Sequence, residues 1–296
     1  MVKRFKCRKA AVFSDIHSNY HAFLACYEDA LKKGAELFIF LGDYVSDLAD
    51  PQKTMDLVYA IREKYPTVCL RGNRERYMLE HKNGDTAFAE GSKTGSLLYT
   101  FQQLRPHDLD FFESLPIYEE IELGGILLEI AHASPWDDRF YFEGTDRNTD
   151  TVLQQMKYRY FLCGHCHRQY IHQNGDKTVC NPGSIGVPRD HTCSTQYAML
   201  EIKGQSVAFE LCRIPYDIPA MIHRQFESGL TKIAPYWAIG VLYDTLTGQE
   251  QLMELLRRLE GADVYDEQAW HDHAAQLGMK FTEEELLAFS EELQRR

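Results

Sequence analysis

Residues 161–169 read FLCGHCHRQ, and this short stretch supports three different interpretations. Cys163, Cys166 and His167 have the spacing of a covalent haem attachment site. The two cysteines alone have the spacing of a redox dithiol. His165 and His167 alone are a candidate pair of imidazole metal ligands. Each interpretation implies a different protein, so the rest of the chain has to decide between them.

The lack of a recognisable secretion signal disfavours the haem and redox interpretations. The chain of 296 residues is 44% hydrophobic and 26% charged, as expected of an ordinary globular protein. The basic start MVKRFKCRK leads into an apolar run too short for a secretion signal, and no stretch is long enough to span a membrane. We therefore expect a cytoplasmic location without membrane attachment, where the eight cysteines are free thiols. Cys163 and Cys166 are then expected to pack in the interior.

The overall charge narrows the choice of partners. A formal net charge of −12 disfavours broad capture of nucleic acid or of anionic membranes, because both need a basic surface. A local basic groove is still compatible with this charge. The basic residues at positions 3–9 are expected to form a solvated N-terminal arm.

Strands and helices alternate over the first two-thirds of the chain, as short apolar runs and amphipathic stretches follow each other. Gly124-Gly125 indicates the turn of a hairpin within residues 117–132, and further strands follow. This order predicts two packed sheets with helices outside. Strands are expected at 10–14, 37–42, 67–70, 117–132, 160–164, 177–181, 195–202 and 206–214, and helices at 18–33, from Pro51 to Pro66, at 86–115 with a new segment at Pro106, and at 148–158.

The last part of the chain has a different character. After Pro215 and Pro219 the apolar residues recur at helical spacing, and Thr282 with Glu285 forms a capping-box pattern. We predict a domain at residues 1–216 and a helical extension at 217–296. The extension is a candidate lid, packing element or oligomer surface.

Each predicted strand of the first two-thirds ends in a residue that can bind a metal ion. Because the carboxyl ends of strands in an open α/β sheet converge on one crevice, these side chains can meet there. Carboxylate, amide and imidazole ligands together suit Mn²⁺, Fe or Zn²⁺ better than Ca²⁺. The candidate ligands are Asp15, His17, Asp43, Asn73, His132, His165 and His167.

Asp-x-His, Gly-Asp, Gly-Asn, a single His and Gly-His-x-His, in this order, resemble the motifs of the calcineurin-like metallophosphoesterase superfamily. The resemblance covers about residues 8–215, and NPGSIG at 181–186 is similar to the small bacterial phosphodiesterase-type branch. It implies an α/β fold, a four-layer α/β/β/α sandwich, here with a C-terminal helical extension.

The resemblance also implies two divalent metal ions, Mn favoured over Fe or Zn. Asp15, His17 and His167 would hold the first ion. Asn73, His132 and His165 would hold the second, and Asp43 would bridge both. A hydroxide shared by ions about 3.5–4 Å apart would attack phosphorus in line with the leaving oxygen.

Arg74 departs from the family pattern, since many members have a histidine there that protonates the leaving oxygen. A guanidinium stays charged at any working pH, so Arg74 is predicted to clamp a phosphate oxygen instead. The substrate then either has a leaving group that needs little protonation or uses another acid, for which His191 is the candidate. A phosphoanhydride, as in dinucleoside polyphosphates, and an activated phosphodiester both fit the first case.

The sequence therefore predicts a binuclear metal-dependent hydrolase of phosphodiester or phosphoanhydride bonds, acting on a small phosphorylated substrate such as a nucleotide. A phosphomonoesterase, including a protein phosphatase, is the nearest alternative. A non-catalytic, metal-stabilised binding scaffold is the second, and the acidic charge disfavours a nuclease without ruling it out. Asp47 is expected to be an ordinary loop carboxylate, with support of a metal ligand as the alternative.

Overall fold

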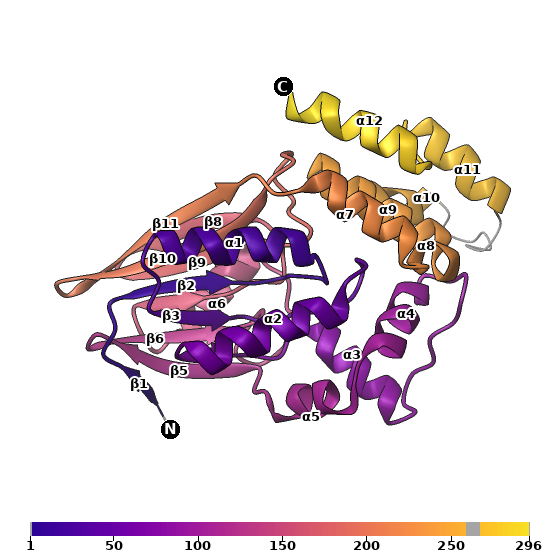
Figure 1. Cartoon of the computed structure of the whole chain (residues 1–296). Helices are drawn as coiled ribbons and strands as arrows, with labels where there is room; N and C mark the ends of the chain where they lie inside the picture. The colour runs from indigo at the N-terminus through magenta and orange to yellow at the C-terminus, as the bar shows by residue number, and fades with distance from the viewer. Residues whose placement is uncertain (1, 259–266, 296) are drawn as a thin grey trace.

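The computed structural model describes residues 2–258 and 267–295, and most of its elements follow the predicted alternation with small shifts of their ends (Figure 1), while the strands at Lys3–Phe5 and Gln169–Asn174 and the helix at Asn73–Lys82 were not predicted. The strands are β1 (Lys3–Phe5), β2 (Lys9–Phe13), β3 (Leu37–Phe40), β4 (Thr67–Cys69), β5 (Tyr118–Leu123), β6 (Ile126–Ala131), β7 (Tyr160–Leu162), β8 (Gln169–Asn174), β9 (Lys177–Pro182), β10 (Thr195–Lys203) and β11 (Ser206–Ile214). The helices are α1 (Tyr20–Lys32), α2 (Pro51–Lys64), α3 (Asn73–Lys82), α4 (Gly95–Gln103), α5 (Pro106–Ser114), α6 (Arg147–Gln155), α7 (Ile218–Glu227), α8 (Leu230–Ile233), α9 (Pro235–Thr247), α10 (Gln251–Arg258), α11 (Glu267–Gln276) and α12 (Glu283–Gln294).

The strands form two sheets. One has the order β11-β10-β2-β3-β4, and the other has the order β1-β5-β6-β7-β9-β8. Strands β2, β3 and β4 run parallel to one another, and β6 runs parallel to β7. The carboxyl ends of β2, β3 and β4 therefore lie along one edge of the first sheet, and those of β6 and β7 along one edge of the second.

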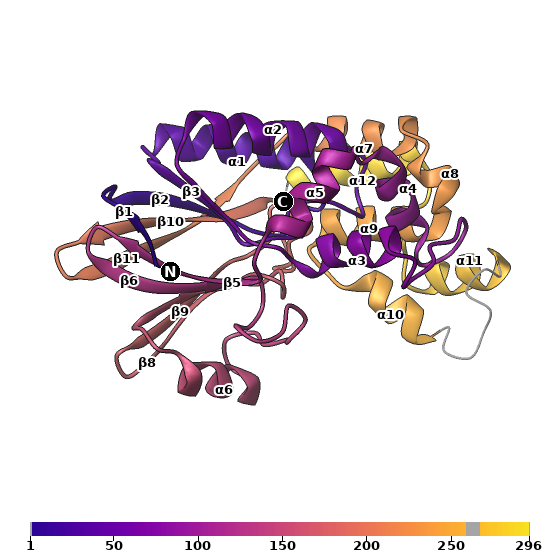
Figure 2. The same cartoon turned by 90° about the horizontal axis from the view of Figure 1, so that it is seen from below.

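The two sheets pack face to face, with α1 and α2 outside one sheet and α6 outside the other (Figure 2). Side chains alternate between the faces of a strand, so Val12 of β2 points into the core between the sheets while Phe13 packs under the outer helices. Ile39, Ile130 and Leu162 line the same inter-sheet core and are fully buried. The predicted four-layer α/β/β/α sandwich is confirmed.

Helices α7–α12, called the helical extension below, lie along one end of the sandwich (Figure 1). They share an apolar core that includes Met221, Leu242 and Leu286. The capping box that begins α12 is confirmed, because the hydroxyl of Thr282 accepts the main-chain N–H of Glu285 at 3.2 Å and Glu285 accepts that of Thr282 at 3.1 Å. Within residues 2–258 and 267–295, no helix has the length and apolarity needed to cross a membrane.

The basic side chains of the N-terminal arm are largely exposed, as expected, but residues Lys3–Phe5 also pair as a strand. β1 pairs in parallel with β5, and Lys3 and Arg4 form ion pairs with Glu119 and Glu122 at 2.9 Å each. The strand was not predicted because three residues, of which Lys3 and Arg4 are exposed, are too few to show an alternation. Acidic partners on β5 offset their charge.

Two helical segments also differ from the prediction. Helix α3 was not predicted, because NRERYMLEHK has no continuous apolar stripe. Residues 86–94 were expected to be helical but form turns, in which the hydroxyl of Ser92 donates to the carbonyl of Ala89 at 2.7 Å. Helix α4 begins only at Gly95, while the predicted restart at Pro106 is confirmed by α5.

Candidate metal centre

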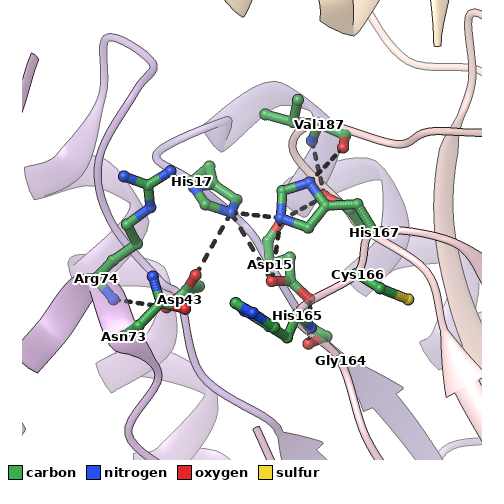
Figure 3. Close-up of polar contacts among 12 residues, drawn as sticks. Asp15, His17, Asp43, Asn73, Arg74, Gly164, His165, Cys166, His167 and Val187 are labelled. Carbon is green, nitrogen blue, oxygen red and sulfur yellow. Dashed lines mark hydrogen bonds and ion pairs between the residues drawn. The ribbon is translucent and has the colours of Figure 1, made fainter. Parts of the chain in front are cut away.

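The side chains predicted to bind metal follow the carboxyl ends of β2, β3, β4, β6 and β7. Potential ligand atoms of Asp15, His17 and His167 all lie within 4.8 Å of one another, and so do those of Asp15, Asp43 and His132. All five of these residues are buried. Figure 3 shows the side chains of Asp15, His17, Asp43 and His167 pointing toward one another. The structure thus brings together residues that lie more than a hundred positions apart in the chain.

The backbone at this convergence is unusual. Five residues have positive φ angles, between 48° and 68°, which residues other than glycine rarely adopt. They are Asp15, His17, Asp43, His165 and His167. Such strain is held only where the surrounding structure fixes it, and it collects at functional sites. Five of the seven predicted ligands therefore have this strained backbone, and Asn73 and His132 do not.

Glycines next to the strained residues allow the strand ends to approach. Gly42 has a φ of 106°, and a Cβ there would lie 2.5 Å from the main-chain nitrogen of Gly72. A Cβ at Gly164 would lie 2.7 Å from Oδ2 of Asp15. No side chain fits at either position without moving the backbone or the carboxylate. The Gly-Asp, Gly-Asn and Gly-His motifs therefore carry their glycines for reasons of space.

Three imidazoles present Nε2 to the cluster and bind an oxygen outside it through Nδ1. Nδ1 of His17 lies 3.0 Å from Oδ2 of Asp47, and Nδ1 of His132 lies 2.9 Å from the carbonyl of Leu41. Nδ1 of His167 lies 2.7 Å from the carbonyl of Val187 (Figure 3). An acceptor at Nδ1 holds the proton there and leaves the Nε2 lone pair for a metal ion. All three rings are thus prepared as ligands in the same way.

The polar atoms at the centre fit a cation better than they fit one another. Nε2 of His17 and Nε2 of His167 face each other at 3.1 Å, where only one proton can lie between two lone pairs. Within the described part of the chain, the buried Oδ1 of Asp15 accepts no hydrogen bond, although Nε2 of His167 lies 3.3 Å away. A buried, unpaired carboxylate oxygen among imidazole nitrogens is the donor set of a divalent metal site.

Asn73 and His165 complete the second side of the cluster. Oδ1 of Asn73 lies 3.1 Å from Nε2 of His132. The ring of His165 lies 5.2 Å from the ring of His132, and its main-chain N–H donates to Oδ2 of Asp15 at 3.0 Å. The side chain of His165 is partly buried, whereas His132 is fully buried. Asn73 and the ring of His165 therefore lie beside His132, although the ring nitrogens of His165 fall outside both groups of ligand atoms that come within 4.8 Å of one another.

The electrostatics of two imidazoles are dominated by the carboxylates. Burial by itself lowers the pKa of His17, but the nearby carboxylates of Asp15 and Asp47 raise it to about 9. Burial likewise lowers the pKa of His132, and the charge of Asp43 raises it to about 10. Without metal these two rings hold a proton at neutral pH, and a metal ion has to displace it.

The other two imidazoles behave differently. Burial lowers the pKa of His165 to about 4, with a further decrease from the charge of His132. Burial also lowers the pKa of His167 below its ordinary value. These two rings are neutral at pH 7 and available to a metal ion without losing a proton.

Asp47 is not the ordinary loop carboxylate that we expected. It is 3% exposed, and its Oδ2 contacts both Nδ1 of His17 and Nη2 of Arg74 at 3.0 Å. Its Oδ1 accepts the indole N–H of Trp237 at 2.9 Å. The prediction was wrong because the partners of this carboxylate come from three distant segments, which no local pattern reveals.

Glu75 is a residue of the site that the sequence analysis missed. Its carboxylate is fully buried and accepts the main-chain N–H groups of Asp43, Tyr44 and Gly72 at 2.8–2.9 Å. It thereby fixes the loop that carries Asp43. The Gly-x-x-Glu spacing of a helix N-terminus was the available signal, but glycine lacks the side chain of a full capping box.

The two residues proposed to act on the substrate have different positions. Arg74 lies beside the cluster, and its main-chain N–H donates to Oδ1 of Asp43 at 2.8 Å (Figure 3). His191 is exposed on a loop, with its main-chain N–H bound to the carbonyl of Gly248 at 3.0 Å. The structure does not bring the imidazole of His191 into the cluster, and its role as an acid stays a prediction.

The cysteines of the opening motif are buried thiols. Cys163 and Cys166 are at most 1% exposed, and the side-chain amide of Asn181 donates to Sγ of Cys166 at 3.2 Å. All eight cysteines of the chain are free. Burial raises the pKa of Cys166 to about 12, so this thiol is poorly suited to redox chemistry. The expectation that the pair packs in the interior is confirmed.

Comparison with known proteins places this site in a family. Residues 9–205 match the family model of the calcineurin-like phosphoesterase superfamily domain, and the chain belongs to that superfamily. It is 27% identical over 242 residues to the uncharacterized protein MJ0912 of Methanocaldococcus jannaschii, covering 77% of this chain and 94% of that protein. The predicted family is therefore confirmed.

Two solved structures share the fold. A metallophosphoesterase from Sphaerobacter thermophilus aligns with a TM-score of 0.65 and 21% identity, over 81% of this chain and 99% of that one. The hypothetical protein PH1004 from Pyrococcus horikoshii OT3 aligns with a TM-score of 0.67 and 19% identity, over 80% of this chain and 98% of that one. At these identities the likeness supports the architecture alone.

Proposed function

We propose that this chain is a binuclear metal-dependent hydrolase of phosphodiester or phosphoanhydride bonds. The observation that carries the proposal is the overlap of two ligand groups. Oδ2 of Asp43 lies 3.7 Å from Nε2 of His17 and 3.5 Å from Nε2 of His132, so one carboxylate faces both sides of the cluster. A shared carboxylate between two sets of ligands is typical of two-metal phosphoesterase sites.

The ligands divide into two positions. Position 1 is defined by Asp15, His17 and His167, position 2 by Asn73, His132 and His165, and Asp43 lies between them. Mixed oxygen and nitrogen ligands suit Mn²⁺, Fe or Zn²⁺, and we favour Mn²⁺. When bound, two divalent cations neutralise the charge of the phosphoryl oxygens and lower the pKa of a nucleophilic water.

Arg74 defines which substrates this site can cleave. Its guanidinium is held at the cluster by Asp47, 3.0 Å away, and its charge is available to a non-bridging phosphate oxygen. It cannot protonate the leaving oxygen, since a guanidinium keeps its proton at working pH. Substrates whose leaving group departs unprotonated are therefore favoured, as in phosphoanhydrides, nucleotide-type anhydrides and activated diesters.

The proposal is tested with the Mn²⁺-loaded enzyme on two chromogenic substrates. We expect bis-p-nitrophenyl phosphate to be hydrolysed faster than p-nitrophenyl phosphate, and the rate to rise steeply as the pKa of the leaving phenol falls across a series of aryl diesters. Faster turnover of the monoester would favour a phosphomonoesterase. Bound Mn²⁺ without turnover of either substrate would favour a binding scaffold and contradict the proposal.

A further inference from the structure

The acceptors that orient the imidazoles differ in origin between the two positions. At position 2, Nδ1 of His132 binds the carbonyl of Leu41, directly after β3 and inside the core between the sheets. At position 1, the acceptors are the carboxylate of Asp47 and the carbonyl of Val187, which lie on loops outside the sheets. Both of these loops pack against the helical extension.

The first loop is held through Asp47. The indole N–H of Trp237, in α9, donates to Oδ1 of Asp47 at 2.9 Å. The side-chain amide of Gln225, in α7, donates to the carbonyl of Asp47 at 3.3 Å and to that of Ala238 at 3.2 Å. The next residue, Leu48, is 1% exposed and lies within the apolar core of the extension. Three contacts thus fix the acceptor of His17 from the extension.

The second loop is held through Val187 and the residues after it. The side chain of Val187 belongs to the same apolar core of the extension as Leu48. Further along the loop, Arg189 forms an ion pair with Glu250 at 2.8 Å, and the main-chain N–H of His191 donates to the carbonyl of Gly248. The acceptor of His167 is therefore anchored on the turn between α9 and α10.

We propose that the helical extension is part of metal position 1 and sets its affinity, while position 2 depends on the sandwich alone. Trp237 is then a positioning residue that acts on His17 through Asp47 and touches no ligand itself. This inference rests on the proposed function, because it requires two metal positions. Outer partners of metal-binding histidines typically change metal affinity by about 10- to 100-fold. Loss of the extension's contacts should therefore weaken position 1 selectively.

The test is a Mn²⁺ titration of the full chain by calorimetry, with anomalous diffraction from crystals at limiting Mn²⁺ to assign the positions. Trp237→Phe removes the indole N–H and keeps an aromatic ring. Asp47→Asn cuts the same route from the sandwich side and serves if Trp237→Phe does not fold by circular dichroism. The control is Tyr243→Phe, which removes a 3.3 Å hydrogen bond to the carbonyl of Gly278 within the extension.

We expect two ions in the wild type and in Tyr243→Phe. In Trp237→Phe, affinity at position 1 should fall about 10- to 100-fold, and affinity at position 2 should change less than about twofold. Asp47→Asn should give at least the same fall at position 1, and because Asp47 also holds Arg74, the selectivity for position 1 is judged from Trp237→Phe. Equal weakening of both positions, or unchanged affinity at both, would overturn the inference while leaving the proposed function intact. A wild type that binds no Mn²⁺ would overturn both.

Discussion

The two proposed metal positions each combine two histidines with one oxygen ligand, but they are supported from different regions of the molecule. Position 2 takes its support from a strand end, where Leu41 accepts from His132 in the core between the sheets. Position 1 takes its support from Asp47, which binds Trp237 of the extension. One half of the site is therefore oriented by the end of a strand, while the other half depends on helices that come later in the sequence.

Asp43 links the two positions, so its loss should have the largest effect. Asp43→Asn removes the shared negative charge, and we expect the turnover of bis-p-nitrophenyl phosphate to fall roughly 10³-fold or more, because metal ions contribute several kcal/mol to charge stabilisation. Steady-state kinetics with saturating Mn²⁺ measures this. Asp56→Asn, at an exposed position on α2, is the control. Activity within tenfold of the wild type would mean that the two positions do not act together.

Metal binding at both positions should depend on pH, because each position holds one imidazole with a raised pKa. His17 has a pKa of about 9 and His132 of about 10, so both are protonated at pH 7 in the metal-free protein. Ligation needs the neutral ring, and Mn²⁺ affinity should therefore rise as the pH increases toward 9. Calorimetry in two buffers of different protonation enthalpy should detect about one to two protons released at pH 7. Binding without proton release would contradict these pKa values.

The same groups predict how the metal-free protein responds to pH. A pKa raised in the folded state means that the folded state binds protons more tightly than the unfolded state. The stabilisation is fully present below about pH 6.5, the ordinary pKa of histidine. It is lost as the pH rises through 9 and 10, the values for His17 and His132. The melting temperature of the metal-free protein should fall over that range, and a constant value would contradict the prediction.

Glu75 supports the site from the sandwich, as Trp237 does from the helical extension. Its substitution should have the smallest effect of those considered. Glu75→Gln replaces an oxygen that accepts main-chain N–H groups, and unsatisfied buried donors cost about 1–3 kcal/mol in the free energy of unfolding. Urea denaturation measures this loss. Because Glu75 fixes the loop of Asp43 and the start of α3 at Asn73, Mn²⁺ affinity should fall more at position 2 than at position 1. A larger loss of Mn²⁺ affinity at position 1 than at position 2 would contradict this prediction.

Much of the fold and all seven candidate ligands could be predicted because each lies next to a strand with a readable apolar pattern. Val12 and Ile39 belong to such runs, and Asp15 and Asp43 follow them by a few residues. The rule that the carboxyl ends of parallel strands share an edge then brings the ligands together. The resemblance to the superfamily supplied how they divide between two ions.

The residues that were missed depend on contacts between distant segments. Asp47 binds Trp237, which lies 190 positions away, and neither local sequence indicates the other. Helix α3 has no continuous apolar stripe because two of its four buried residues, Asn73 and Glu75, are polar. The division of the chain at residue 216 stays a prediction, and the contacts of Asp47 and Val187 are the features that bear on it.

We propose that seven side chains surround two cations. Anomalous diffraction from crystals of the Mn²⁺-reloaded protein tests it most directly. We predict two peaks about 3.5–4 Å apart, one beside His17 and His167 and one beside His132 and His165, with Asp43 in contact with both. A single peak, no peak, or two peaks outside this cluster would contradict the account.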